Sequence, residues 1–174
     1  MKKYILVFFV LTGINLFAQT TPLKIGYVDS EVILKTFPEA IKAQGELDAL
    51  ISKWNDQVDS MTAALQSEYQ LYQKNSPAMK EDKKMEAQQK LIQQQQQIED
   101  FRKQKFTQGT GEIYKKQEEL LKPVKAKIFA AIENIAKADS MQFVFDKSGD
   151  IILLYADSSF DITFDVLKLL KNGK

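Results

Sequence analysis

Three clusters of polar side chains have residue types that can do chemistry, and each has a simpler structural explanation. Asp29-Ser30-Glu31 could bind a metal or transfer protons, but no His or further acid lies nearby, and such residues commonly cap helices. Tyr114 with Lys115 and Lys116, or Ser158-Ser159 with Asp157, could supply a nucleophile. No nucleophile–base pair, phosphate loop or metal-ligand spacing accompanies them, so surface and capping roles are sufficient.

The residue types most used in catalysis are missing from the sequence. The 174 residues include no His, which removes the commonest general base and the commonest metal ligand. They include no Cys, which excludes a lipid-anchoring cysteine and disulfide bonds. The sequence therefore predicts a protein that is not an enzyme, with no catalytic residue, no metal site and no cofactor.

The first residues have the pattern of a secretory signal peptide at residues 1–18. Lys2 and Lys3 precede a short apolar run, and the small residue Ala18 precedes a polar segment. The run is shorter than the about 20 apolar residues of a membrane span. Cleavage after Ala18 would leave 22 basic and 23 acidic residues, a net charge of −1, from 24 and 23 in the full chain. This balance gives no reason to expect nucleic acid as a partner.

The two ends of the chain are expected to form one small body, from residues 23–38 and 122–174. The first end predicts a strand over 23–29 and a short capped helix that Pro38 interrupts. The second predicts a helix from Pro123 to Met141, a β-hairpin of strands 142–146 and 151–155, and a terminal helix after Asp161.

Residues 39–121 between the two ends predict an arm made of two long antiparallel helices. Apolar residues alternate four and three apart, the repeat of a coiled-coil seam, at Leu47, Ile51, Trp54, Val58, Met61, Leu65 and Tyr72, with Glu68 interrupting the series between the last two. Asn75-Ser76-Pro77 then breaks the helix, and a second run continues from about Met79 to Lys122. At ~1.5 Å per residue, each helix spans ~50 Å or more and must project from the body.

Two features of the second helix predict local weakness. Gln93 to Gln97 place amides in the seam, which predicts looser packing in the outer part of the arm. Gly109 and Gly111 are costly in a helix interior, and they indicate a locally weak helix, a close approach to the partner helix, or a hinge about which the arm bends.

Charge is divided between the two helices of the arm. The first is mainly acidic and the second mainly basic, with Arg102, Lys103, Lys105, Lys115 and Lys116 among its cations. One interpretation is ion pairing that sets the antiparallel register. The other is a basic inner face that binds a partner.

Three predicted strands and a few short helices give a small core for so long an arm. Association with other chains, whose strands complete a common sheet or barrel, is the expected remedy. The expected fold class is thus α+β, a small β-barrel-type association body with a long antiparallel α-helical hairpin inserted.

The two ends resemble the Skp/OmpH family most specifically. The resemblance rests on Lys24-Ile25-Gly26-Tyr27-Val28-Asp29, Phe143-Val144-Phe145-Asp146, Ile152-Leu153-Leu154-Tyr155-Ala156 and the closing Asp161-Ile162-Thr163-Phe164-Asp165-Val166-Leu167-Lys168. It covers the whole mature chain, with the arms similar in pattern rather than in residues. It implies a homotrimer with a β-barrel body and three arms that enclose a cavity. It also implies an ATP-independent chaperone in the periplasm of a Gram-negative bacterium that holds unfolded outer-membrane proteins. Well-known members are strongly basic, so the near-neutral charge here gives no support for membrane or lipopolysaccharide contact.

A holdase needs sparse apolar side chains on a flexible polar arm, where many weak contacts add up without nucleotide. The candidates for client contact are Tyr69, Leu71, Tyr72, Met79, Met85, Phe101 and Phe106, with Gly109 and Gly111 as the candidate hinge. For each client candidate the alternative is packing within the seam, and Leu71 and Met79 are the expected exceptions. The alternative function is an exported coiled-coil structural or adaptor protein of the cell envelope, against which the polar seam and the glycine pair argue.

Overall fold

The computed structural model describes residues 22–150 and 152–173, so the predicted signal peptide at 1–18 lies outside the described residues. Helices predominate, and two short strands come from opposite ends of the chain. In chain order the elements are β1 (Ile25–Val28), α1 (Ser30–Thr36), α2 (Pro38–Asn75), the 3₁₀ helix η1 (Ser76–Ala78), α3 (Glu81–Phe106), α4 (Glu112–Ala138), β2 (Phe143–Asp146), the 3₁₀ helix η2 (Ser158–Phe160) and α5 (Thr163–Asn172).

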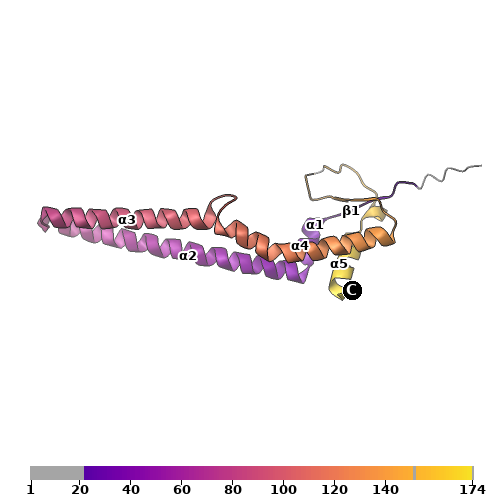
Figure 1. The fold of residues 1–174 in the computed structure, drawn as a ribbon, viewed down its shortest axis with the longest axis horizontal. Coiled ribbons are helices and arrows are strands. Elements are labelled where there is room, and N and C mark those ends of the chain that lie inside the picture. The colour runs from indigo at the N-terminus through magenta and orange to yellow at the C-terminus, as the bar shows by residue number, and fades with distance from the viewer. Residues whose placement is uncertain (1–21, 151, 174) are drawn as a thin grey trace, which may run out of the picture.

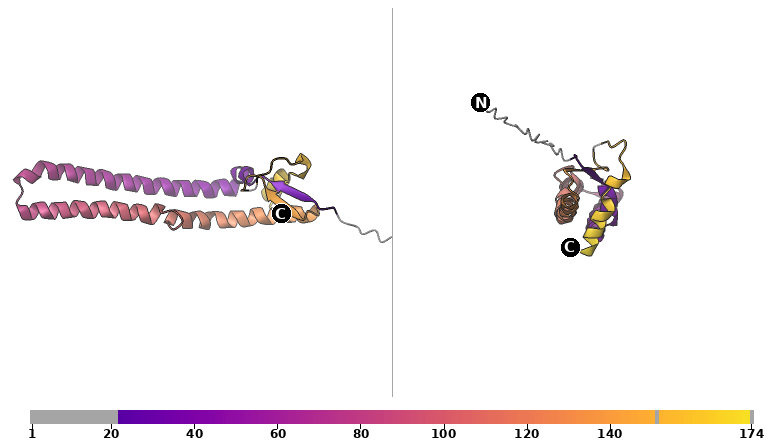
Figure 2. Two further views of the ribbon diagram at one scale, coloured as in Figure 1. Left: turned by 90° about the horizontal axis from the view of Figure 1, so that it is seen from above. Right: turned by 90° about the vertical axis from the view of Figure 1, so that its right-hand side faces the viewer.

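A long antiparallel pair of helices projects from a small body (Figure 1). One leg is the continuous helix α2, and the other leg is α3 followed by α4. The 38 residues of α2 span about 57 Å at the usual rise of an α-helix. Figure 2 shows the two legs side by side along this length, with α5 and the strands gathered at one end. The predicted antiparallel helical arm is confirmed, but its second leg consists of two helices and not of one continuous helix.

The predicted seam holds the two legs together. On α2 the buried positions follow the repeat of this seam, at Ala40, Ala43, Leu47, Trp54 and Val58, with Ile51 half-buried between Leu47 and Trp54. Farther out the same repeat is only half-buried, at Met61, Leu65 and Tyr72. On α3 the single buried residue is Ile98, and the glutamine-rich stretch outside it is half-buried or exposed. The prediction of looser packing in the outer part of the arm is confirmed.

The helix breaks have identifiable causes. Asp29 caps α1, because its carboxylate accepts a hydrogen bond from the Val32 backbone N–H at 3.0 Å, which confirms the capping interpretation. Pro38 occupies the first turn of α2, where its missing N–H costs nothing. At the far end η1 contains Pro77 and makes the predicted tight break before α3.

The second leg breaks at a different place from the one predicted. Helix α4 runs from Glu112 through Pro123 to Ala138, so the prediction of a helix beginning at Pro123 is wrong. Pro123 removes one backbone hydrogen bond, but burial of Val124 and Ile128 directly after it holds the helix together. The break lies instead at residues 107–111, so Gly109 and Gly111 are in a loop rather than in a helix interior, and that prediction is wrong too.

The strands also pair differently from the prediction. β2 pairs in parallel with β1, in the register Ile25↔Phe143 to Val28↔Asp146, and Tyr27 makes an isolated bridge with Asp161. The predicted β-hairpin is wrong, because residues 152–157 form no strand in the described chain. β1 is buried at its last three residues. By pairing with it, β2 gains backbone hydrogen-bond partners and packs against the core. Ile152, Leu154 and Tyr155 are 84–93 % exposed, so pairing there would bury nothing within the chain.

The core lies where the base of the arm meets the ends of the chain. Ile33 of α1 and Val166 of α5 are fully buried, which confirms the predicted amphipathic terminal helix. They pack with Phe37 at the corner between α1 and α2 and with Val124, Ile128 and Ala131 of α4. The core therefore includes residues from both ends of the chain and from both legs of the arm.

The carboxylate of Asp146, at the end of β2, joins β2 to the start of α1. It accepts hydrogen bonds from the Ser30 hydroxyl at 2.5 Å, the Ser30 N–H at 3.1 Å and the Ser148 hydroxyl at 2.8 Å. Burial raises the pKa of Asp146, but these bonds outweigh burial and hold the pKa below its usual value. The ionised carboxylate thus stabilises the junction between the first strand–helix unit and the second strand.

Replacement of this carboxylate should destabilise the body in a pH-dependent way. We expect Asp146→Asn to lower the free energy of unfolding by about 1–2 kcal/mol at pH 7. Because the folded-state pKa is depressed, the contribution is complete above the unfolded-state pKa of about 3.9 and is lost as the pH falls through the folded value. Urea unfolding followed by circular dichroism at pH 7 and at pH ~3 measures this difference. Asp150→Asn, in the exposed turn after β2, is the control and should match the wild type; an equal loss at both pH values would contradict the role of the charge.

Candidate binding surface and hinge of the arm

The residues predicted to contact a partner fall into three groups along the arm. Tyr69, Leu71 and Met85 are exposed on its outer half. Tyr72 and Met79 are half-buried near the tip. Phe101 and Phe106 are half-buried at the inner end of α3, where they pack within the seam. The structure thus does not bring the seven residues into one site.

The two phenylalanines belong to an aromatic cluster around Trp54. The Trp54 and Phe106 rings meet edge to face, with centroids 6.0 Å apart and planes at 83°. The Lys105 ammonium lies 5.0 Å from the centroid of the Trp54 ring and 5.5 Å from that of Phe101. These are cation–π contacts, and the Lys105 side chain is only 14 % exposed. The cluster fixes the end of α3 against the middle of α2.

The loop over residues 107–111 follows this cluster directly and stands out from the leg in Figure 1. Gly109 has φ +76°, a left-handed conformation that favours glycine. Gly111 is buried, and a Cβ on it would lie 2.8 Å from three backbone atoms of Lys105 and Thr107. Both glycines are therefore needed for this loop shape.

One ion pair spans the loop. The Lys105 ammonium bonds the carboxylate of Glu112, so the last turn of α3 is tied to the first residue of α4. Glu112 also stands at the N-terminus of α4, where a negative charge stabilises the helix dipole. Lys105 thus joins the two ends of the loop and also contacts the aromatic cluster. The sequence contains many lysines, and no local pattern distinguished this one.

Cross-leg ion pairs confirm the prediction that the acidic and basic helices pair. Glu39 of α2 bonds Lys127 of α4 at 2.7 Å, and Glu68 of α2 bonds Lys90 of α3 at 2.9 Å. The hydrogen bond from Lys90, and then one from Gln94, lower the pKa of Glu68. The Gln94 Oε1 is buried and has no hydrogen-bond partner among the described residues. Both legs therefore put polar groups into the outer seam, where aliphatic side chains would pack more tightly.

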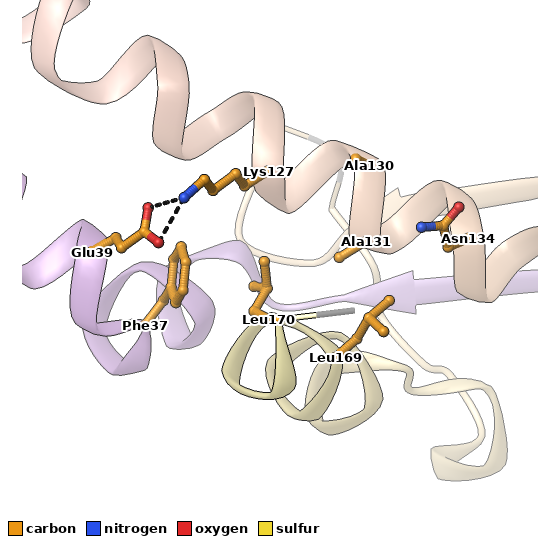
Figure 3. Close-up of a pocket in the computed structure, with 9 residues that line it drawn as sticks. Phe37, Glu39, Lys127, Ala130, Ala131, Asn134, Leu169 and Leu170 are labelled. Carbon is orange, nitrogen blue, oxygen red and sulfur yellow. Dashed lines mark hydrogen bonds and ion pairs between the residues drawn. The ribbon is translucent and has the colours of Figure 1, made fainter.

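A shallow cavity at the base of the arm is lined by core residues. Its volume is about 380 Å³, and Figure 3 shows Phe37, Leu169 and Leu170 on one side and Ala131 of α4 on the other. Glu39 and Lys127 close its rim with two hydrogen bonds of 2.7 Å. The mainly apolar lining is continuous with the core, so the cavity reflects packing between α2, α4 and α5.

A larger groove lies on the outer half of the arm. It has a volume of about 650 Å³ and runs along the line where α2 meets α3. Its apolar and aromatic walls are Leu65, Tyr69, Tyr72, Leu91 and Ile92. The list of predicted contact residues omitted Ile92, which is 67 % exposed. Its position directly after Leu91 was the available signal, because two consecutive residues of a helix cannot both face the seam.

The described part of the chain contains neither a metal-binding cluster nor a spanning helix. In residues 22–150 and 152–173, no three His, Cys, Asp or Glu side chains gather as metal ligands would. No helix in these ranges is long and apolar enough to cross a membrane.

The family of the chain follows from its sequence match and its fold. Residues 24–170 match the family described as outer membrane protein (OmpH-like). The chain belongs to the OmpH-like family. Its fold is similar to a solved structure from Caulobacter crescentus CB15 described as an OmpH-like outer membrane chaperone, with a TM-score of 0.73 and 14 % sequence identity. That match covers 87 % of this chain and 86 % of the other. No curated protein sequence matches the chain.

The two kinds of glycine in this OmpH-like arm allow a matched test of the loop. Gly111→Ala should destabilise the protein by about 1–3 kcal/mol, because the backbone atoms of Lys105 and Thr107 must move away from the new Cβ. Gly45→Ala is the control: no atom lies within 4 Å of the added Cβ, and alanine in the interior of α2 should stabilise by about 0.5–1 kcal/mol. Thermal and urea unfolding measure both changes. Equal effects of the two substitutions would show that the loop geometry does not matter.

Proposed function

We propose that this protein is an ATP-independent holdase chaperone that binds unfolded outer-membrane proteins in the periplasm of a Gram-negative bacterium. The observation that carries the proposal is the arm, which extends far from the body and leaves apolar side chains uncovered on its outer half. Tyr69, Leu71, Met85 and Ile92 are all exposed there. Membership of the OmpH-like family supports the same function.

The arm has the properties that such binding needs. The exposed apolar side chains are few among the charged and amide residues of the arm, so the arm binds weakly at each point and does not collapse on itself. Several weak contacts with one client add up through multivalency and need no nucleotide. Met79 and Met85 suit this role because a flexible thioether adapts to varied partners.

The near-neutral charge shifts the binding toward apolar contacts. With residues 1–18 removed, 22 basic and 23 acidic residues remain. Several of these charges are paired within a helix or across the legs, as in Glu68 with Lys90. The proposed clients are therefore held by apolar side chains, and neither nucleic acid nor lipopolysaccharide is part of the proposal.

We also propose a homotrimer, with residues 23–38 and 122–174 as the association body and residues 39–121 as the arm. Apolar side chains around the strands support it, because one chain leaves them exposed. They are Phe143 of β2, Phe164 of α5, and Ile152, Leu154 and Tyr155 after β2. Strands of several chains would cover these residues in a common barrel and would arrange three arms around a cavity.

The loop at 107–111 is the proposed hinge of each arm. It divides the second leg into α3 and α4 while α2 runs past it unbroken. Gly109 supplies a left-handed backbone conformation, Gly111 allows the close approach of the chain to Lys105 and Thr107, and the Lys105–Glu112 ion pair holds one closed geometry. Breaking that pair would let the outer arm move to fit clients of different size.

A direct test is dilution of a urea-denatured porin with and without the mature protein, in the absence of ATP. We expect light scattering from aggregated porin to fall as the molar excess of the protein rises. A matched variant with Tyr69→Ser, Leu71→Ser, Met85→Ser and Ile92→Ser should keep its helical content by circular dichroism and lose most of the suppression. Unchanged aggregation at molar excess of the wild-type protein would favour the structural or adaptor function.

Multi-angle light scattering of the mature protein tests the assembly separately. We expect the mass of a trimer. Leu154→Ser combined with Tyr155→Ser should shift the mass toward the monomer, because these exposed side chains are the proposed contact between chains. A wild-type monomer would contradict both the shared barrel and the enclosed cavity.

A further inference from the structure

We propose that the groove on the outer half of each arm is a binding site for extended, uncharged peptide segments in which apolar side chains alternate with polar ones. The site is the outer-arm groove already described, walled by Leu65, Tyr69, Tyr72, Leu91 and Ile92. This inference rests on the proposed holdase function and specifies which segments of a client the protein binds and at which place on the arm.

The shape of the groove fits a short extended segment. Its residues on α2 extend from Thr62 to Tyr72, and those on α3 from Gln88 to Gln95. Ten residues of α-helix extend about 15 Å, which equals the length of four or five residues of extended chain. Side chains of such a segment point alternately to opposite sides, about 7 Å apart on one side. Two or three alternate side chains can therefore enter the groove together.

The chemistry of the groove separates a floor from a rim. Leu65, Tyr72 and Leu91 are half-buried and form an apolar floor. Tyr69 and Ile92 are exposed on either side. The amides of Gln66, Gln88 and Gln95 lie along the same groove, and Gln88 donates a hydrogen bond of 2.6 Å to the Tyr72 hydroxyl. Amides offer donors and acceptors to a peptide backbone and to polar side chains that point out of the groove.

Charge determines which segments fit. Among the described residues that line the groove, none carries a formal charge. Two other grooves of the outer arm differ, since one is lined by Lys83, Glu86 and Lys90 and the other by Glu68 and Lys90. An ionised side chain that entered the outer-arm groove would lose water and gain no opposite charge. The groove therefore favours uncharged segments over charged ones.

The alternating pattern is the one that strands of a transmembrane β-barrel carry. Their apolar side chains face the lipid and alternate with polar ones that face the lumen. Before such a strand is assembled, its apolar face needs cover along the whole segment. The outer-arm groove covers that face over a few residues and leaves the polar face to the amides and to water.

A fluorescent reporter at the edge of the groove tests the proposal in the full mature protein. The chain has no Cys, so one introduced cysteine can be labelled selectively. Gln73→Cys lies one turn along α2 from Tyr69, at the end of the groove, and Lys74→Cys lies one turn from Leu71 as a matched control. Each cysteine variant carries an environment-sensitive dye. The peptide added to it has blocked termini and about seven residues, in which Val or Tyr alternates with Ser or Gln. We expect a saturable blue shift from the dye at position 73 and none at position 74.

Substitutions in the groove and beside it then define the site. Ile92→Ser and Tyr69→Ser should each weaken the peptide affinity about tenfold, because each removes one apolar wall. Ile41→Ser removes a comparably exposed apolar side chain at the base of α2, outside the groove, and it should change the affinity less than about twofold. A peptide with Glu at its apolar positions should not bind. Raising the salt from about 0.05 M to about 0.5 M should leave the affinity within about twofold.

The outcomes separate this inference from the holdase proposal. Suppression of porin aggregation without a peptide-induced shift at position 73, or with equal losses of peptide affinity from Ile92→Ser and Ile41→Ser, would overturn the groove and leave the holdase. A groove-specific peptide shift without suppression of porin aggregation would support the groove and overturn the holdase. Strong weakening by salt would overturn the uncharged class of segment.

Discussion

The packing of one unbroken helix against a broken one is the constraint on which the rest of this molecule depends. Helix α2 carries the seam along its whole length, while the opposite leg is divided into α3 and α4. The apolar seam is buried only as far out as Val58 and Ile98. Beyond them, Glu68 and Gln94 take seam positions and the burial of both legs falls. The inner half of the arm is thus held mainly by apolar packing, and the outer half leaves tyrosine, isoleucine and leucine side chains uncovered.

The body is small, but it shares its core with the base of the arm. Its core combines α1, α5, the start of α2 and the second half of α4, so the arm and the body share one set of packed side chains. The carboxylate of Asp146 adds polar specificity, because it bonds Ser30 and Ser148 at the junction of β2 with α1. What the body does not cover are the apolar residues around β2, and the trimer that we propose would bury them.

Much of this organisation could be predicted from the sequence, and the errors have physical causes. The 3.5-residue repeat, the Pro77 break, the Asp29 cap and the amphipathic end of the chain are local signals, and each was correct. The break at 107–111 was misplaced, because Pro123 is the stronger local signal and only burial of Val124 and Ile128 overrides it. The hairpin after β2 was wrong, because alternation identifies a strand but not its partner. Lys105 could not be singled out either, since only the fold brings Trp54, Phe101 and Glu112 around it.

The parallel pairing of β1 with β2 has a consequence for the order in which the chain folds. Lys24 and Gln142, which bond at the start of this sheet, stand 118 residues apart. Contacts of such high sequence separation are slow to form, because a long loop must close first. The tip of the arm depends on contacts closer in sequence, such as Glu68 with Lys90 at a separation of 22 residues, and pairing of the two legs toward the base then brings the ends of the chain together. We therefore expect the outer arm to form before the sheet closes. A chain that leaves a membrane channel N-terminus first would hold β1 unpaired until nearly its whole length had emerged.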